Sequence, residues 1–195
     1  RNVAALGKDK IHAFLSSPTG AMERKTIWLF GRQLLNSLIV ALCTTILGIF
    51  LATTAAYAFS RFRFPGRRAG LLSFLVIQMF PGTMMMIPLY ILVSSLGLLD
   101  QLLGLILVYS TTAIPFCVWM LKGYFDNIPV DIDDSAWIDG CNIFQRLWYI
   151  ILPIGAPGIM VAGFFSFVVS WGDYLIVSVI SQSQRTATAT LVIQR

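Results

Sequence analysis

Charged residues are scarce in this chain. Only 12% of its 195 residues are Asp, Glu, Lys or Arg, whereas 57% are hydrophobic. A soluble domain carries about 25% charged residues, and a chain this apolar has too few polar groups to cover a surface that faces water. The composition therefore argues against a soluble globular domain and predicts a protein whose solvent is lipid.

Cysteine and histidine are also few. Cys43, Cys117 and Cys141 are far apart, and the first two lie in apolar runs, which argues against a disulfide framework or a zinc site. His12 has no second ligand near it in sequence, so we expect no bound metal. The chain also lacks a G-x-x-x-x-G-K-[ST] motif and so has no visible phosphate-binding loop. We expect no cofactor in this chain and no enzymatic activity of its own.

Long apolar stretches are what the chain has instead. Four of them lie near residues 36–59, 70–94, 102–121 and 157–181, and the only charge they contain is Asp173. Each is long enough to cross a hydrocarbon core about 30 Å thick, which takes roughly 20 helical residues. Strands of a membrane β-barrel would instead alternate over about ten residues. We therefore predict an all-α bundle with four transmembrane helices.

Prolines interrupt the second stretch, which contains Pro81, Gly82 and Pro88. A proline inside a helix removes a backbone hydrogen bond and kinks the helix. Two interpretations stay open: a simple kink within a packed bundle, or a bent helix that lines a pathway.

The arginines predict the orientation. The connection between the first two stretches has four of them, Arg61, Arg63, Arg67 and Arg68, whereas Asp100 is the only charge between the second and third stretches. Cytoplasmic loops are enriched in Lys and Arg, so we expect the arginine loop to be cytoplasmic and the Asp100 turn to lie outside. The basic residues before the first stretch oppose this assignment but are outweighed; they are Arg24, Lys25 and Arg32.

A polar segment at 126–156 then falls on the cytoplasmic side. Within it, residues 131–152, called the elbow below, carry the signals of two short helices. Asp131 is expected to cap the first helix, with Asp133 and Asp134 near its positive end, and Gly140 to end it. Asn142 and Gln145 have the spacing of a capping box for the second helix.

An apolar stripe is expected on the second helix of the elbow. Its members are Phe144, Leu147, Trp148 and Ile151, at i, i+3, i+4 and i+7. Pro153 and Pro157 are expected to break the chain before it continues as the fourth membrane helix. From these features alone, the elbow is either an ordinary amphipathic connector on the membrane surface or a docking element.

The stretch "DDSAWIDGCNIFQRLWYIILPIGAP" resembles the EAA loop of binding-protein-dependent ABC importers. Asp134-Ser135-Ala136 falls on the Glu-Ala-Ala positions, Ile138-Asp139-Gly140 on the following Ile-Asp-Gly, and Leu152-Pro153 with Pro157 on the final prolines. Two residues depart from the family pattern, because Asp134 replaces Glu and Ser135 replaces Ala.

The resemblance extends over about residues 36–180. "AAYAFSRFRFPGRR", "FPGTMMMIPLYILVSSLGLLD" and "FFSFVVSWGDYL" are similar, in order, to the maltose-type (MalG-like) carbohydrate branch. The resemblance implies a type I ABC importer permease fold. That fold usually has six spans, so we expect the chain to lack one N-terminal and one C-terminal span. Residues 1–35 would then be mostly extramembrane, and 182–195 would form an outer loop or an incomplete C-terminal segment.

The resemblance implies a permease subunit of the bacterial or archaeal plasma (inner) membrane that takes up a sugar or oligosaccharide. Expected partners are a second related permease subunit in a heterodimer, two cytoplasmic ATPase subunits that bind ATP and Mg, an external solute-binding protein and membrane lipid, but no nucleic acid. The residues implied in ATPase coupling are Asp134, Ser135, Ala136, Asp139, Gly140 and Phe144. A non-sugar solute (glycerol phosphate, a polyamine or an amino acid) and, more remotely, an ion-coupled carrier stay open.

Asp173 is the candidate substrate contact from the residues themselves. An acid within a membrane helix is a functional candidate, and Trp171 and Tyr174 beside it suit a sugar. The alternative is an aromatic belt at the membrane interface with an acid at the helix end.

Overall fold

The computed structural model describes residues 18–173, 175–180 and 188, and of residues 18–29 and 175 only the backbone. All regular elements in this part are helices, as the sequence predicts. They are α2 (Pro18–Arg61), α3 (Arg67–Met79), α4 (Gly82–Ser95), α5 (Leu102–Asp126), α6 (Val130–Ile138), α7 (Ile143–Arg146), the π-helix η1 (Leu147–Ile151), α8 (Leu152–Gly172) and α9 (Leu175–Ile180).

Three helical segments of the described residues are long and apolar enough to cross a membrane. They are Phe30–Arg61, Leu102–Asp126 and Ile143–Gly172, and the bent pair α3–α4 makes a fourth if it is counted as one span. These segments correspond to the four predicted stretches. The first and third run a few residues longer than predicted, the second is bent, and the fourth has different bounds. The segments predicted at 1–35 and 182–195 fall partly outside the described residues. Of the first segment, residues 18–35 belong to α2.

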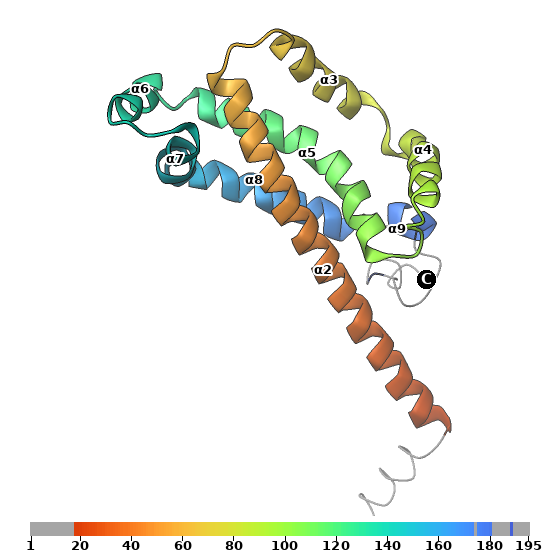
Figure 1. The fold of residues 1–195 in the computed structure, drawn as a ribbon. Coiled ribbons are helices and arrows are strands. Elements are labelled where there is room, and N and C mark those ends of the chain that lie inside the picture. Colours follow the sequence, from red (N-terminus) through yellow and green to blue (C-terminus); the bar gives the residue numbers. More distant parts are fainter. Residues whose placement is uncertain (1–17, 174, 181–187, 189–195) are drawn as a thin grey trace, which may run out of the picture.

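Helix α2 crosses both α5 and α8, and the α3–α4 pair passes around the other side of α5 (Figure 1). Small residues allow α8 to approach α5 closely. A Cβ atom at Gly155 would lie 2.7 Å from the ring of Phe125, and one at Gly158 would lie 2.6 Å from the ring of Tyr124. Close backbone approach through small residues is typical of membrane helices, because apolar side chains gain little by leaving lipid for one another.

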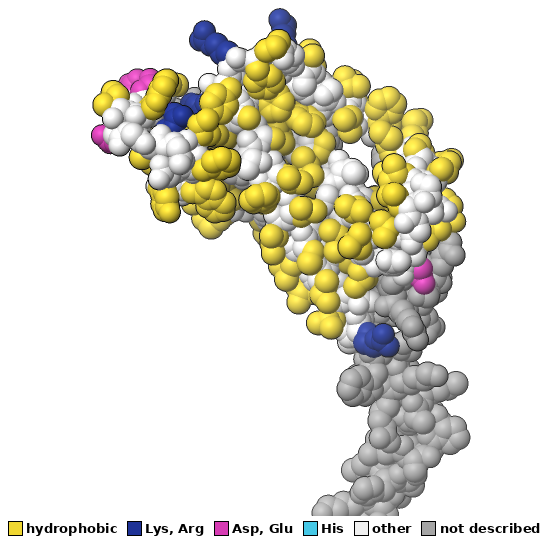
Figure 2. Space-filling model, viewed as in Figure 1, with side chains coloured by type: hydrophobic (Ala, Val, Ile, Leu, Met, Phe, Trp, Pro, Cys, Tyr) yellow, Lys and Arg dark blue, Asp and Glu magenta, His cyan; other side chains and the backbone are white. Residues whose placement is uncertain are grey.

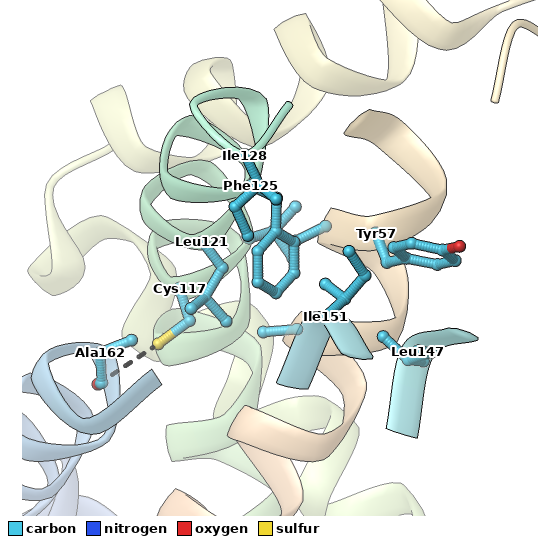
Figure 3. Close-up of a cluster of buried hydrophobic side chains, with 11 residues drawn as sticks. Tyr57, Cys117, Leu121, Phe125, Ile128, Leu147, Ile151 and Ala162 are labelled. Atoms are coloured by element: carbon cyan, nitrogen blue, oxygen red, sulfur yellow. Dashed lines mark hydrogen bonds between the residues drawn. The ribbon is translucent and has the colours of Figure 1, made fainter. Parts of the chain in front are cut away.

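Two clusters of buried apolar side chains lie along α5. The first joins α2, α5, η1 and α8, with Tyr57, Phe125, Leu147 and Ile151 among its members (Figure 3). The second, at the other end of α5, joins α2, α4, α5 and α9. The first cluster therefore anchors the second half of the elbow on the membrane helices.

The second predicted span is bent by 103° between α3 and α4. The break lies at Phe80 and Pro81, both with extended ψ angles, 129° and 131°. The residue before a proline avoids helical dihedrals, so Phe80 ends α3. Pro88 lies inside α4 without interrupting it. The predicted kink is confirmed, but as a sharp break at Pro81 alone.

Pro153 and Pro157 do not break the chain, contrary to the sequence prediction. Helices α7, η1 and α8 run on from one to the next, so the last span begins at Ile143 rather than at residue 157. Before Pro153 the helix widens into the π-helix η1, in which Leu152 N–H donates to the carbonyl of Leu147, five residues back. A π-turn is one of the adjustments by which a membrane helix accommodates a proline that lacks an N–H.

The last span also ends earlier than predicted. Helix α8 stops at Gly172, and Asp173 has an extended backbone (φ −78°, ψ 117°) before α9 begins. The prediction of one helix over 157–181 is therefore wrong at both ends. The apolar composition of 175–180 continues across this break, so hydropathy alone could not have located it.

Candidate functional site

Helix α6 forms the first half of the elbow, and its N-cap lies two residues before the predicted cap. Its N-cap is Pro129, and no side chain caps it. Asp131 is thus already inside the helix and cannot act as the N-cap, which corrects the sequence prediction. Asp131 and Asp133 still lie in the first turn, where the positive end of the helix dipole favours acids.

Gly140 ends α6 as predicted. Its φ is +83°, in the left-handed region that favours glycine. Gly140 N–H donates to the carbonyl of Trp137, and Cys141 N–H donates to the carbonyl of Ala136, both at 3.0 Å. This pair of bonds is a Schellman motif, which satisfies the last carbonyls of the helix and fixes the direction of the chain after it.

Asn142 begins the second half of the elbow with the predicted capping box. Its side-chain oxygen accepts from Gln145 N–H, and Gln145 Oε1 accepts from Asn142 N–H, both at 2.8 Å. The Arg146 guanidinium lies over the Trp137 ring, 5.7 Å from its centroid, and so links α7 back to α6. The angle between the two short helices is thus fixed by local bonds and by this contact.

The predicted apolar stripe is divided between two environments. Leu147 and Ile151 are buried in the first apolar cluster, whereas Phe144 and Trp148 are 73% and 54% exposed. The stripe was placed with α-helical spacing, and the π-helix from Leu147 onward does not keep that spacing.

The outer surface of the elbow combines acids with large apolar groups. Asp134, Ser135, Asp139 and Gly140 are exposed, and so are Trp137, Ile138, Phe144 and Tyr149. Figure 2 shows acidic and hydrophobic side chains together at this end of the molecule. Ala136 differs, since it is only 4% exposed. It packs within the chain, so among the residues that the resemblance implies in ATPase coupling, Ala136 does not lie on the exposed surface of the elbow.

The second candidate region is at the end of α8. Asp173 Oδ1 accepts from Ile176 N–H at 3.2 Å and so caps α9, while the Asp173 carbonyl accepts from the Tyr109 hydroxyl. The Trp171 ring stacks on Phe167. Tyr174 lies outside the described residues. Asp173 is thus at a junction between helices rather than in the middle of one.

A small pocket between α3, α5 and α8 was not found from the sequence. Its volume is about 270 Å³, and its lining comprises Gln78, Thr112, Ala113, Phe116, Cys117, Phe165, Ser166 and Val169. The stacked rings of Phe116 and Phe165 have centroids 4.2 Å apart. Gln78 Nε2 donates to the Thr112 carbonyl at 3.0 Å, and the Ser166 hydroxyl, 1% exposed, has no hydrogen-bond partner within the described residues.

Polar residues within the apolar stretches were the available signal for this pocket. Gln78 and Ser166 are 88 positions apart, and no local pattern places them together. In the described part of the chain, no three His, Cys, Asp or Glu side chains come together in a way that could hold a metal ion.

Comparison with known proteins gives close sequence relatives. The chain is 37% identical to the inner membrane ABC transporter permease protein YcjP of Escherichia coli (strain K12), over 78% of this chain and 55% of that protein. It is 36% identical to the maltodextrin transport system permease protein MdxG of Bacillus subtilis (strain 168), over 82% and 57%. It is 35% identical to the trehalose transport system permease protein SugB of Mycobacterium tuberculosis (strain CDC 1551 / Oshkosh), over 85% and 60%.

A solved structure shares the fold. It is the crystal structure of a bacterial ABC transporter involved in the import of the acidic polysaccharide alginate, with a TM-score of 0.77 and 23% identity over 85% of this chain and 58% of that chain. The chain thus spans less than two thirds of the length of each of these four proteins. The sequence profile of the family described as "Binding-protein-dependent transport system inner membrane component" matches residues 20–194. The chain therefore belongs to the family of binding-protein-dependent transport system inner membrane components.

Proposed function

We propose that this chain is part of the permease subunit of an ATP-driven importer, and that its elbow couples the membrane helices to a cytoplasmic ATPase. The observation that carries the proposal is the build of the elbow. A Schellman motif and a capping box fix its two short helices, and its second half continues into α8. A force applied to such an element reaches the membrane without being lost in a flexible loop.

The exposed surface of the elbow supports docking on a partner. Trp137, Ile138 and Phe144 are 69%, 87% and 73% exposed, and Asp134 and Asp139 lie among them. Aromatic groups are typical of the residues that anchor protein interfaces, and polar groups form the rim around them. Asp134, Ser135, Asp139, Gly140 and Phe144 are the proposed coupling residues. Ala136 supports them from inside, and ATP and Mg bind to the ATPase subunits.

A neutral sugar or oligosaccharide is the proposed substrate, delivered by an external solute-binding protein and passed between this subunit and a second related permease. Two relatives are named for maltodextrin and trehalose transport. The pocket between α3, α5 and α8 is lined by aromatic rings, an amide and hydroxyls, with no charged side chain among its lining residues. Aromatic faces with hydrogen-bonding groups suit sugars, and the absence of a lining charge favours an uncharged solute.

Trp171, Asp173 and Tyr174 are proposed as further contacts of the pathway. Asp173 follows directly after the end of α8, the helix that contributes Phe165, Ser166 and Val169 to the pocket. Asp173→Asn tests this, because the amide oxygen can still accept from Ile176 N–H while the charge is removed. A changed transport rate or substrate preference supports the contact, and unchanged transport of every substrate tested assigns Asp173 to capping alone.

Co-purification tests the function as a whole. The full-length permease is isolated from its native membrane, its associated proteins are identified, and ATP hydrolysis is measured with a panel of solutes. We expect an ATPase, a second permease and a solute-binding protein, and stimulation by sugars. Stimulation by glycerol phosphate, a polyamine or an amino acid alone would contradict the proposed substrate class. Transport that follows an ion gradient without ATP hydrolysis would contradict the proposed mechanism.

A further inference from the structure

The last turn of α2 carries a buried polar network that reaches the elbow. Arg61 Nε lies 2.6 Å from Asp133 Oδ2, and the Tyr57 hydroxyl donates to Asp133 Oδ1 at 3.2 Å. Arg61 Nη2 also donates to the carbonyl of Ile128 at 2.9 Å, in the turn between α5 and α6. Tyr57 and Arg61 are spaced i and i+4, so one face of α2 makes all three contacts.

The network is almost closed to solvent. The side chains of Arg61 and Asp133 are 8% and 5% exposed. The Arg61 Nε–H does not point along its contact with Asp133, so that contact is an ion pair rather than a linear hydrogen bond. A buried ion pair contributes little net stability compared with apolar residues of the same size, because both charges lose their hydration. Stability alone therefore does not explain why charges lie here.

The position of the pair suggests another role. The elbow is connected through the backbone to α5 on one side, by the short turn at 127–129, and to α8 on the other, by a continuous helix. Helix α2 has no such connection, since the chain leaves it for α3. Any movement of the elbow must therefore reach α2 through side chains, and Asp133 is next in sequence to the exposed Asp134 on the docking surface.

Apolar contacts accompany the ion pair but differ in kind. Tyr57 packs in the cluster that includes Leu147 and Ile151 (Figure 3). Such contacts keep surfaces together but allow them to slide, whereas a charge pair with two additional hydrogen bonds fixes one register. The Ser60 hydroxyl, which donates to Asp126 Oδ1 at 2.7 Å, adds a link from the same turn of α2 to the end of α5.

We propose that Tyr57, Arg61 and Asp133 form a lock that makes α2 move with the elbow. They are positioning residues: none needs to touch the substrate or the ATPase. When the ATPase shifts the elbow, the lock carries α2 along with α5 and α8, so that the three crossing helices change their arrangement together. This inference rests on the proposed coupling function of the elbow.

The central test separates folding from coupling. Arg61→Met or Asp133→Leu alone leaves one buried charge unpaired, so each should lower the yield of assembled complex. The double variant Arg61→Met/Asp133→Leu has neither charge and should recover the yield. It should still transport about fivefold less solute per ATP hydrolysed than the parent, which is the lower end of ordinary coupling effects. Arg63→Met/Asp131→Leu makes the same chemical changes at exposed positions and should behave like the parent.

Arg61→Lys is the second variant, in case the double variant does not assemble. It retains the charge, but a single ammonium group on a flexible stem does not reproduce the planar guanidinium, which contacts Asp133 through Nε and the Ile128 carbonyl through Nη2. Normal yield with less transport per ATP supports the lock. If either variant assembles at normal yield and transports as much solute per ATP as the parent, the lock is overturned. If the parent itself neither binds an ATPase nor responds to solute, it is the proposed coupling function that fails.

Discussion

At the scale of single residues, the buried Ser166 hydroxyl is a candidate hydrogen-bonding group for a bound sugar. Ser166 is one of the residues that line the pocket between α3, α5 and α8, and its buried hydroxyl has no hydrogen-bond partner among the described residues. Burying a polar group without a partner costs free energy, so its removal should not harm folding. A bound sugar would supply the partner, and the loss of one hydrogen bond would then weaken the interaction by about 1 kcal/mol.

Ser166→Ala should therefore assemble normally and transport sugar more slowly, by roughly 3- to 10-fold at saturating binding protein. Ser170→Ala is the matched control one turn further along α8. The Ser170 hydroxyl already donates to the Ser166 carbonyl, within its own helix, and is not part of the pocket lining. Equal transport by Ser166→Ala and the parent would remove the pocket from the proposed pathway.

Ala136 and Asp134 provide a second contrast between neighbouring residues. Ala136 is buried, so Ala136→Glu places a charge inside the elbow and should lower the yield of folded complex. Asp134 is exposed, so Asp134→Ala should leave the yield unchanged and reduce the amount of co-purified ATPase. The measurements are complex yield and the ATPase-to-permease ratio. Normal yield for Ala136→Glu would contradict the burial, and an unchanged ratio for Asp134→Ala would exclude Asp134 from docking.

Among the structural elements, the elbow depends most on one backbone conformation. Gly140 has φ +83°, and a Cβ there would meet no atom within 4 Å. Strain rather than crowding should therefore decide what a substitution does. A side chain in the left-handed region costs about 1–2 kcal/mol, and more for a β-branched residue.

Gly140→Val should change the angle between α6 and α7 and reduce solute-stimulated ATP hydrolysis several-fold, while the membrane helices still assemble. Gly140→Asn should be milder, because asparagine tolerates positive φ. Gly123→Val is the control: it adds the same side chain where there is also free space, without a positive φ. A Gly140→Val variant that hydrolyses ATP and transports like the parent would mean that the elbow is only a connector.

The elements that sequence predicted best are those set by neighbouring residues. The Gly140 turn and the Asn142–Gln145 capping box each depend on bonds across a few residues. The start of α6 was missed because Pro129 supplied a boundary two residues before the acid that was taken as the cap. The π-helix before Pro153 was missed because hydropathy and spacing rules assume α-helical geometry.

Contacts between distant segments could not be predicted in the same way. Tyr57 and Asp133 are separated by 76 positions, and their contact depends on how α2 crosses α5. The 103° bend between α3 and α4 is of the same kind, because proline predicts a break but not its angle. The sequence therefore identified the elbow, and the structure was needed to find the buried lock and the pocket.

The described part of the molecule has charged groups near two ends and an apolar middle. Hydrophobic side chains are spread over the middle of the surface seen in Figure 2. The arginine loop and the elbow lie at the same end, since Arg61 contacts Asp133. The Asp100 turn lies with the end of α9, because Asp100 N–H donates to the Ile180 carbonyl. This arrangement agrees with the alternation of the spans on which the predicted orientation depends.

The orientation itself can be tested by labelling. In a variant without Cys43, Cys117 and Cys141, a cysteine at Arg68 should react with a membrane-impermeant reagent only from the cytoplasmic side, and one at Gln101 only from the outside. Both positions are exposed, so a lack of reaction reflects the membrane rather than burial. The physical reason is the excess of arginine in the first connection.

Basic residues near the start of the first span oppose the predicted orientation. Arg24 and Lys25 precede the first span and Arg32 lies at its start, so all three would be outside in this orientation. Restoring Cys141 alone, in the elbow, gives an independent third position that should react from the same side as Arg68→Cys. Reaction of Arg68→Cys from the outside and Gln101→Cys from the cytoplasm would reverse the orientation. The elbow would then face away from ATP, and the proposed coupling and the lock would both fail.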